Sequence, residues 1–276
     1  MFAIPFPVVD PVIFSIGGFS IRWYSLAYIT GILCGWRWAL HMARVQPGAV
    51  TPKHLDDIVI WITLGVVLGG RLGYVLFYKP TYFLEHPLEI FMMWQGGMSF
   101  HGGMLGVFFA MYLYARHHGF SFFALSDIVG ASVPFGLFFG RIANFINGEL
   151  WGRPSDVPWA MIFPGAGPLP RHPSQLYEAS LEGILLFLIL YIAWKAGLWR
   201  RTGAMSGIFM IAYGCFRFLL EFTRQPDAHL GLFWGSVSMG QLLSMPMILI
   251  GLYLLNWSRY STPRKTESSS SRSRQA

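Results

Sequence analysis

Charged residues are scarce in this chain of 276 residues, because Asp, Glu, Lys and Arg together make up 12% of it while 54% is hydrophobic. This composition argues against a soluble domain and is typical of an integral membrane protein. Cysteine is almost absent, since only Cys34 and Cys215 occur and both lie in apolar runs. We therefore expect neither a disulfide framework nor a zinc site.

Two further features are missing. The opening residues, MFAIPFPVVDPVIF, lack a basic start and contain three prolines, so they do not resemble a cleavable signal peptide. We expect the first membrane helix to be retained. The chain also lacks an evident internal repeat, which argues against the paired halves of many transporters.

The net charge of +7 does not by itself indicate nucleic acid, because five basic residues lie near the C-terminus in SRYSTPRKTESSSSRSRQA. Residues 259–276 are predicted to form a disordered basic tail that can touch anionic lipid headgroups. Nucleic acid is not an expected partner.

What the chain does contain is a series of apolar stretches, each near the roughly 20 residues that a helix needs to cross a hydrocarbon core about 30 Å thick. Thr51 and Pro52 suit the start of the second helix. Glycines four residues apart, such as Gly69 and Gly73, would let helices pack closely. We predict an all-α integral membrane protein with one polytopic domain over 1–258. Its seven expected spans are 21–41, 55–78, 98–115, 124–145, 178–195, 204–222 and 238–257.

The orientation follows from the lysines and arginines in alternate connections, since cytoplasmic loops are enriched in them. Eleven lie on one side, including Arg44, Lys53 and Arg201, against four on the other: Lys79, Arg153, Arg171 and Arg224. This asymmetry predicts an extracytoplasmic N-terminus, a cytoplasmic C-terminus and an extracytoplasmic segment at about 146–177, between helices four and five.

Five arginines remain inside or at the ends of the predicted spans, where a charge is costly without a partner or a watery pocket. Arg37 lies near a cytoplasmic helix end and can reach the interface. With the predicted topology, the costly polar groups of several segments fall within roughly 10 Å of the outer surface. They are Arg22, Tyr24, Arg71, His101, Arg141, Asn144, Arg217 and Glu221.

Helical spacing groups some of these residues. Tyr213, Arg217 and Glu221 are four residues apart in succession and share one helix face. Glu221 can act in a reaction or merely neutralise Arg217. Glu149 follows Arg141 and Asn144 at the start of the extracytoplasmic segment and can likewise be catalytic or form only a salt bridge. His101 stands beside two glycines that leave room for a ligand.

Cationic groups gathered at the outer leaflet, without metal-ligand spacing, suit an anionic lipid headgroup, because arginine binds phosphate oxygens bidentately. A lipid transporter would need further polar groups toward the cytoplasm, and few follow Arg71. An intramembrane serine protease would need a nucleophilic serine paired with histidine, and no such motif is evident. A phospholipid-binding enzyme fits best.

Several ordered motifs resemble the bacterial prolipoprotein diacylglyceryl transferase family. The most specific is GRIANFINGELWGR at 140–153, and the resemblance covers most of residues 15–250. Ser25 and Thr223 depart from the usual family pattern beside these motifs. The other motifs are FSIRWYSLAY (19–28), GGRLGYVLFY (69–78), GGMSFHGGMLG (96–106), RHPSQLYEA (171–179) and FRFLLEFTRQPD (216–227).

The resemblance implies transfer of the sn-1,2-diacylglyceryl group of phosphatidylglycerol to the lipobox cysteine thiol of a prolipoprotein. A thioether would form and sn-glycerol 1-phosphate would leave, in the first step of lipoprotein maturation at the bacterial inner membrane. The expected catalytic residues are His101, Arg141, Glu149, Arg217 and Glu221. The expected phosphatidylglycerol-binding residues are Tyr24, Arg141, Asn144, Gly152, Tyr213 and Arg217.

The mechanism expected is direct displacement by the substrate thiolate, with neither Cys34 nor Cys215 acylated. A thiol with a pKa near 8.5 is a weak nucleophile until it is deprotonated, so a base is useful. His101 is the first candidate because histidine titrates near neutrality, and Glu149 or Glu221 can serve instead. No metal or organic cofactor is expected.

Overall fold

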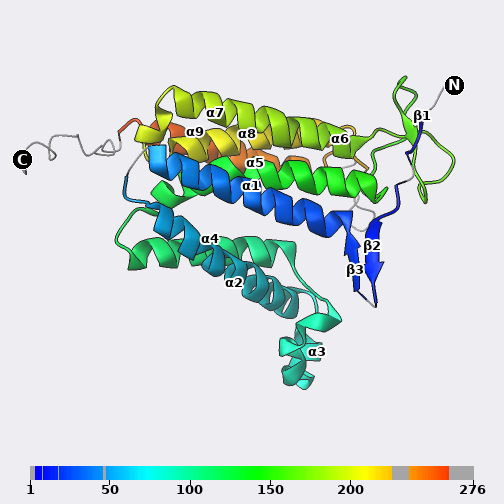
Figure 1. The fold of residues 1–276 in the computed structure, drawn as a ribbon, viewed down its shortest axis with the longest axis horizontal. Coiled ribbons are helices and arrows are strands. Elements are labelled where there is room, and N and C mark those ends of the chain that lie inside the picture. The colour runs from blue at the N-terminus through cyan, green and yellow to red at the C-terminus, as the bar shows by residue number, and fades with distance from the viewer. Residues whose placement is uncertain (1–3, 8, 18, 46–47, 226–235, 261–276) are drawn as a thin grey trace, which may run out of the picture. The chain divides into compact units, whose positions relative to one another are not determined.

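The computed structural model describes residues 4–7, 9–17, 19–45, 48–225 and 236–260. The predicted tail lies outside the described residues from position 261 onward. By their internal contacts the described residues divide into two compact units, one made of those up to 39 and from 127 onward and the other of those from 40 to 126. Helices dominate both (Figure 1). The single domain predicted over 1–258 stays a prediction.

The first unit begins with short strands, which the all-α prediction did not include. Strand β1 (Ile4–Pro5) pairs in parallel with β4 (Met161–Ile162). Strands β2 (Val12–Ile16) and β3 (Phe19–Arg22) form an antiparallel hairpin. The pairing of Arg22 with Val12 explains why the first helix starts at Trp23 rather than at 21.

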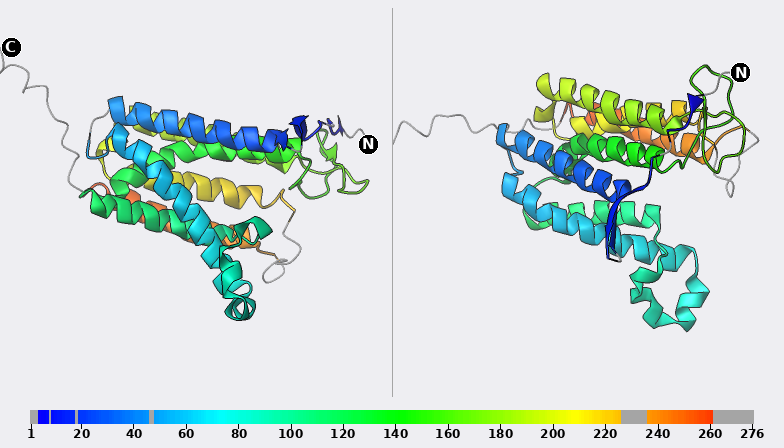
Figure 2. Two further views of the ribbon diagram at one scale, coloured as in Figure 1. Left: turned by 60° about the horizontal axis from the view of Figure 1, so that its bottom comes forward. Right: turned by 45° about the vertical axis from the view of Figure 1, so that its right-hand side comes forward.

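The helices of the first unit run alongside one another in each view (Figure 2). An almost continuous helix over Ser174–Lys195 consists of α6, the π-helical η3 and α7. The bounds are α1 (Trp23–Val45), α5 (Phe122–Ile146), α6 (Ser174–Glu178), η3 (Ala179–Leu185), α7 (Leu186–Lys195), the 3-10 helix η4 (Leu198–Arg200), α8 (Ala204–Leu220) and α9 (Met239–Trp257).

A buried aspartate starts α8. The carboxylate of Asp127, on α5, accepts hydrogen bonds from the backbone N–H of Gly203 at 2.8 Å and of Ser206 at 2.9 Å. The first N–H groups of a helix have no partner within it, so a side chain from another helix satisfies them here. This contact joins α5 to α8, the two helices that carry Arg141 and Arg217.

The second unit is built on α2 (Pro52–Phe77) and α4 (Phe100–His117), with α3 (Pro80–Glu85) and the 3-10 helices η1 (Pro87–Phe91) and η2 (Met93–Gln95) between them. Thr51 caps α2 and Pro52 begins it, as predicted. A Cβ on Gly73 would lie 2.7 Å from the Cα of Gly102, so the predicted close packing of these glycines is confirmed.

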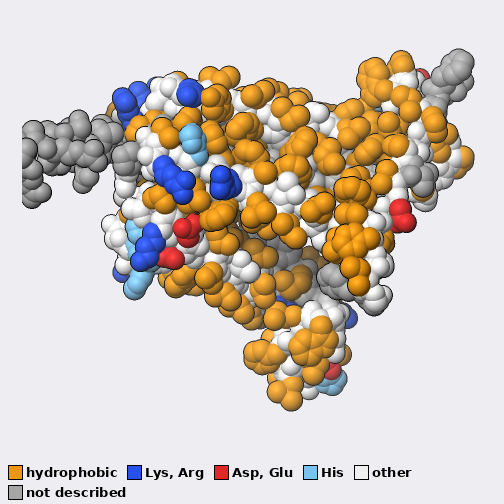
Figure 3. Space-filling view, in the orientation of Figure 1, with side chains coloured by type: hydrophobic (Ala, Val, Ile, Leu, Met, Phe, Trp, Pro, Cys, Tyr) orange, Lys and Arg blue, Asp and Glu red, His pale blue; other side chains and the backbone are white. Residues whose placement is uncertain are grey.

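All seven predicted stretches contain helices. In the part of the chain that the structure describes, four helices are long and apolar enough to cross a membrane, namely Pro52–Phe77, Phe122–Ile146, Ser174–Lys195 and Met239–Trp257. Helix α8 is apolar but shorter. Hydrophobic side chains cover most of the visible helix surfaces (Figure 3), as expected for a membrane protein. The count of seven spans and their orientation stay predictions.

Candidate active site

Six charged side chains of the first unit converge in what we call the ion-pair cluster: Arg141, Glu178, Glu182, Arg217, Glu221 and Arg224. They come from α5, from the helix over Ser174–Lys195, and from α8 with the turn that follows it. The three glutamates are buried, whereas the side chains of Arg141 and Arg217 keep 18% and 16% of their surface exposed. The cluster therefore offers guanidinium groups, and not carboxylates, to a ligand.

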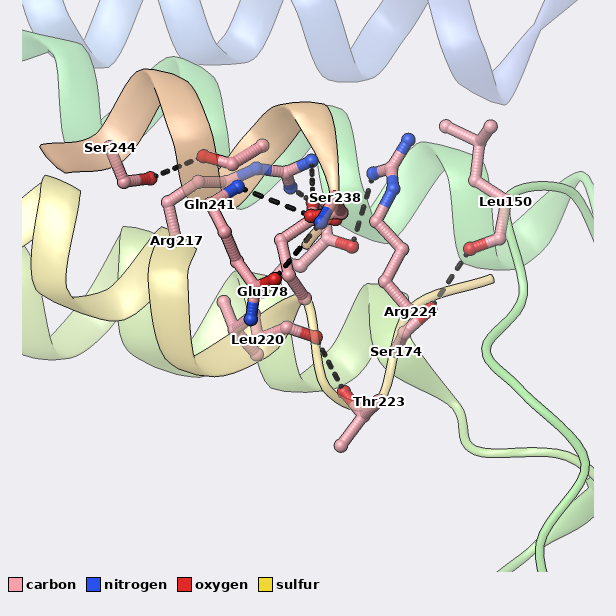
Figure 4. A network of polar contacts seen from close by, with 12 residues as sticks. Leu150, Ser174, Glu178, Arg217, Leu220, Thr223, Arg224, Ser238, Gln241 and Ser244 are labelled. Atoms are coloured by element: carbon pink, nitrogen blue, oxygen red, sulfur yellow. Dashed lines mark hydrogen bonds and ion pairs between the residues drawn. The ribbon is translucent and has the colours of Figure 1, made fainter. Parts of the chain in front are cut away.

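Glu178 lies at the centre of the cluster. Its Oε2 atom lies 2.6 Å from Nε of Arg141 and 3.9 Å from Nη1 of Arg217, and its Oε1 atom accepts a hydrogen bond of 3.4 Å from Arg224. Figure 4 shows the side chains of Arg217 and Arg224 approaching Glu178. Arg217 also forms an ion pair with Glu221, one helical turn further along α8. One carboxylate thus connects three arginines.

Glu182 lies farther from the arginines than the closest contact of Glu178. Its carboxylate is fully buried, and its oxygens lie 3.9 Å from Nη2 of Arg141 and 3.9 Å from Nη1 of Arg217. Those distances exceed hydrogen-bond length. Among the described residues, neither oxygen of Glu182 has a hydrogen-bond partner.

The local sequence explains how Glu178 and Glu182 reach the arginines. Pro173 precedes α6, where its missing N–H costs little. The π-helical segment η3 begins directly after Glu178 and contains Glu182. Such single-turn widenings are frequent at functional sites. Gly183 packs against Phe138 of α5, since a Cβ there would lie 2.7 Å from Cβ of Phe138. The helix can therefore approach Arg141 closely.

The pairing of Glu221 with Arg217 agrees with one of the two roles predicted for Glu221, whereas the carboxylate partners of Arg141 were not predicted. Sequence reasoning missed Glu178 and Glu182 and counted Arg224 only as a loop cation. Glu178 does lie in the quoted motif RHPSQLYEA, and both glutamates stand in an otherwise apolar helix. A charge inside an apolar span needs a partner, and this signal could have found them.

Arg71 is also not a free cation. It is buried in the second unit, where Nε donates to the carbonyl oxygen of Ile90 at 2.8 Å and Nη1 to that of Gly96 at 2.6 Å. Further bonds reach the carbonyls of Glu89, Met92 and Gly97. Arg71 therefore ties the 89–97 turn to α2.

Tyr213 and Arg217 lie one turn apart on α8, as the spacing predicted. The ring of Tyr213 is stacked on Phe209 with centroids 5.7 Å apart. Tyr213 lies within electrostatic reach of Glu182, Arg141 and Arg217. Its position beside them agrees with the prediction, while its role in binding is untested.

Glu149 pairs with amides and not with an arginine. Its Oε1 atom accepts hydrogen bonds from Nδ2 of Asn144 at 2.8 Å and of Asn147 at 3.2 Å. The backbone carbonyl of Glu149 accepts a further bond from the side chain of Gln175. A salt bridge as the role of Glu149 is thus excluded within the described residues, and Asn144 orients this carboxylate.

Gly152 and Tyr24 complete the predicted set of the first unit. Gly152 forms a β-bridge with Arg224, and a Cβ on it would lie 2.5 Å from the carbonyl oxygen of Thr223. Glycine is needed there because two backbones approach closely. The hydroxyl of Tyr24 lies 3.2 Å from that of Tyr28, within electrostatic reach of Arg141 and Glu149.

His101 belongs to the second unit, in the first turn of α4, where Ser99 caps the helix. Its side chain is exposed, and its ring meets the edge of Phe100 at 5.6 Å. Arg141 and Arg217 belong to the first unit, and the predicted meeting of His101 with them stays a prediction.

The extracytoplasmic segment predicted at 146–177 forms a loop held by side chains that bind backbone carbonyls. Arg171 donates to the carbonyls of Ala166 and Gly152, and Arg153 to that of Arg224. His172 lies 3.2 Å from the hydroxyl of Tyr177, and burial lowers the pKa of this histidine below its usual value.

No group of three or more His, Cys, Asp or Glu side chains with the arrangement of a metal site occurs among the described residues. The polar chemistry of the cluster is that of guanidinium and carboxylate groups. Such a site can bind an anion through Arg141 and Arg217 and stabilise negative charge that grows during a reaction.

Comparison with known proteins places the chain in a family. The family model described as prolipoprotein diacylglyceryl transferase matches residues 11–257. The phosphatidylglycerol–prolipoprotein diacylglyceryl transferase of Paramagnetospirillum magneticum is 58% identical over 258 residues, which are 93% of this chain and 96% of the relative. That of Methylocella silvestris is 56% identical, over 92% and 95% of the two chains. That of Vibrio vulnificus is 55% identical, over 92% and 93%. The chain therefore belongs to the prolipoprotein diacylglyceryl transferase family.

Proposed function

We propose that the protein transfers the sn-1,2-diacylglyceryl group from phosphatidylglycerol to the thiol of the lipobox cysteine of a prolipoprotein. The products are a thioether-linked lipid and sn-glycerol 1-phosphate, and the reaction is the first step of lipoprotein maturation. The observation that supports this most directly is the ion-pair cluster, in which two arginines keep part of their surface exposed at the end of apolar helices.

The chemistry follows from the arginines. Arg141 and Arg217 bind the phosphate of the headgroup, because a guanidinium group matches phosphate oxygens. The thiolate sulfur attacks C3 of the glycerol, a carbon–sulfur bond forms, and the carbon–oxygen bond to phosphate breaks. The bond electrons pass to the phosphate oxygen, and the same arginines stabilise the charge that grows there.

The nucleophile comes from the substrate, so the protein needs only to bind, orient and accept a proton. Asn144 and Asn147 fix the carboxylate of Glu149, which makes it an oriented candidate for the base. The exposed His101 is the other candidate because histidine titrates near neutrality. Glu221 is a weaker candidate, because its carboxylate is already paired with Arg217. Tyr24, Gly152 and Tyr213 shape the headgroup site.

We place the protein in the bacterial inner membrane as a bundle of seven spans, with the active site toward the extracytoplasmic side. The basic residues of alternate connections support this orientation. The signal peptide of the prolipoprotein then reaches the site from the bilayer, together with phosphatidylglycerol.

The test is to incubate the purified protein in detergent with phosphatidylglycerol and a lipobox peptide, and to search by mass spectrometry for a diacylglyceryl adduct on the peptide cysteine. A peptide with serine in place of that cysteine is the control and should stay unmodified. A Cys34→Ala, Cys215→Ala double variant should remain active. Absence of the adduct with folded protein would refute the proposed function, and loss of activity in the cysteine-free variant would refute direct displacement.

A further inference from the structure

We propose that binding of the phosphatidylglycerol phosphate at Arg141 and Arg217 is coupled to the uptake of one proton by Glu182. The inference rests on the proposed function for the identity of the lipid. The inference itself requires only that the ligand carry a phosphate anion into a buried site, and this site already holds as many carboxylates as arginines.

The charges of the ion-pair cluster balance in the structure. Arg141, Arg217 and Arg224 contribute three positive charges, and Glu178, Glu182 and Glu221 contribute three negative ones, so the formal sum is zero. The groups within electrostatic reach of Glu182 are Glu178 on its own helix, Arg141 on α5, Tyr213 and Arg217 on α8, and Arg224 beyond α8. Glu221 acts on it through Arg217.

The phosphodiester of phosphatidylglycerol adds one negative charge to this neutral set. Leaving that charge uncompensated among buried groups is costly, because solvation by water is lost and arginine pairs must be shared. One proton restores the balance. The proton binds to the carboxylate whose ionised form is least stabilised by its surroundings.

Glu182 is that carboxylate. Glu178 keeps a 2.6 Å contact with Arg141, and Glu221 is paired directly with Arg217. The oxygens of Glu182 are fully buried, lie 3.9 Å from each arginine and accept no hydrogen bond among the described residues. When phosphate oxygens take the free faces of Arg141 and Arg217, the ionised form of Glu182 loses much of its stabilisation, because it has weak contacts with both arginines and accepts no hydrogen bond among the described residues. Protonation removes its charge and gives it an O–H donor.

The coupling has a definite sign. The complex with lipid holds one more proton than the free protein, so a rise in pH disfavours the complex. Between the pH at which Glu182 becomes ionised in the free protein and the higher pH at which it becomes ionised in the complex, the affinity should fall by about tenfold for each pH unit.

The experiment measures proton uptake directly. Phosphatidylglycerol in mixed detergent micelles is titrated into the purified protein by isothermal titration calorimetry, in two buffers with different ionisation enthalpies. The difference between the two heats gives the protons taken up per lipid bound. The wild type should take up about one proton and bind more weakly at pH 8.5 than at pH 6.5, as the linkage relation requires.

Glu182→Gln keeps the shape of the side chain and removes its charge. We expect this variant to take up no proton and to bind with an affinity that changes little with pH. Asp156→Asn is the control, because Asp156 is an exposed carboxylate of the same unit and lies outside the ion-pair cluster. It should keep the proton uptake of the wild type.

The outcomes separate the proposals. No binding of phosphatidylglycerol by the wild type would refute the proposed function. Binding without proton uptake and without pH dependence in the wild type would refute the coupling, and this arm requires no variant to fold. Uptake that persists in Glu182→Gln would assign the proton to another group and overturn the role of Glu182.

Discussion

Arg141 and Arg217 are oriented by carboxylates before a lipid arrives, because Glu178 of a neighbouring helix holds the Nε of Arg141 and Glu221, one turn along, pairs with Arg217. Preformed donors of this kind need no rearrangement when charge develops. The geometry of the guanidinium group, and not its charge alone, is therefore the property on which the site depends.

Arg141→Lys tests this dependence. Lysine keeps the positive charge but cannot contact Glu178 and two phosphate oxygens at once. We expect the rate of transfer to a lipobox peptide to fall by about 100-fold or more, the loss typical of removing one charge-stabilising donor. Arg116→Lys, at an exposed position on α4, is the control and should keep its rate. An Arg141→Lys enzyme as fast as the wild type would contradict bidentate binding.

Gly152→Ala and Gly140→Ala compare the packing of two glycines of the GRIANFINGELWGR motif. The new Cβ would lie 2.5 Å from the carbonyl oxygen of Thr223 and 2.8 Å from that of His172, and both are backbone atoms that cannot move easily. We expect a loss of stability on the order of 2 kcal/mol or more, as for other overpacked sites. Gly140→Ala meets no atom within 4 Å and should not lower the melting temperature. Equal melting temperatures for both variants would contradict the packing described.

The buried His172 should make the thermal stability of the protein depend on pH. Burial lowers its pKa in the folded protein, so the folded state binds fewer protons than the unfolded state. Its contribution to stability is present above the unfolded pKa of about 6.5 and is lost as the pH falls through the folded pKa. The melting temperature in detergent should therefore drop between pH 7.5 and pH 5.5, and by less in His172→Asn. An equal drop in both proteins would argue against this role.

At the scale of helices, α8 depends on a side chain that it does not contain. Its N-cap is Gly203, which has no side chain to cap with, and Asp127 of α5 accepts from the backbone N–H groups instead. The register of α8 against α5 is thereby fixed at the end of α8 opposite to Arg217. The distance between Arg141 and Arg217 depends on this contact.

Asp127→Ala should lower both stability and activity. Two buried N–H groups and the hydroxyl of Ser206 would lose their acceptor. Each unsatisfied buried donor costs about 1–3 kcal/mol, so we expect a loss of at least about 2 kcal/mol in thermal unfolding. Asp10→Ala, at an exposed position, is the control. Activity that survives a large fall in the melting temperature of Asp127→Ala would show that the register of α8 does not control the site.

The helices could be predicted from the sequence, because apolar runs such as 55–78 and 238–257 carry a strong signal and Thr51 with Pro52 marks a start. The two strands within Val12–Arg22 could not be predicted, since each is short and apolar residues do not alternate with polar ones along the whole segment. Arg141 and Arg217 were found as costly charges, yet their partners Glu178 and Glu182 were missed. Sequence spacing relates residues within one helix, whereas these pairs join different helices.

For the whole molecule, the distribution of positive charge predicts which loops face the cytoplasm. In a cysteine-free background, Asp156→Cys should react with a membrane-impermeant maleimide in intact spheroplasts, because residues 146–177 are expected outside. Arg201→Cys should react only after permeabilisation. Both positions are exposed in the structure, so a difference in labelling reports the side of the membrane. Labelling of Arg201→Cys in intact spheroplasts would reverse the proposed orientation.

The two glutamates within Ser174–Lys195 have a consequence for biogenesis. An acidic residue makes insertion by the translocon less favourable, by about 2.5–3.5 kcal/mol at the centre of a span and by less toward its ends. Glu178 and Glu182 lie in the N-terminal half of this segment, so it should insert less readily alone than an apolar segment of the same length. Arg141 is synthesised before it and Arg217 after it. We expect the segment to enter the bilayer beside α5, with α8 completing the set. Insertion assays on chains truncated before and after residue 217 would reveal that order.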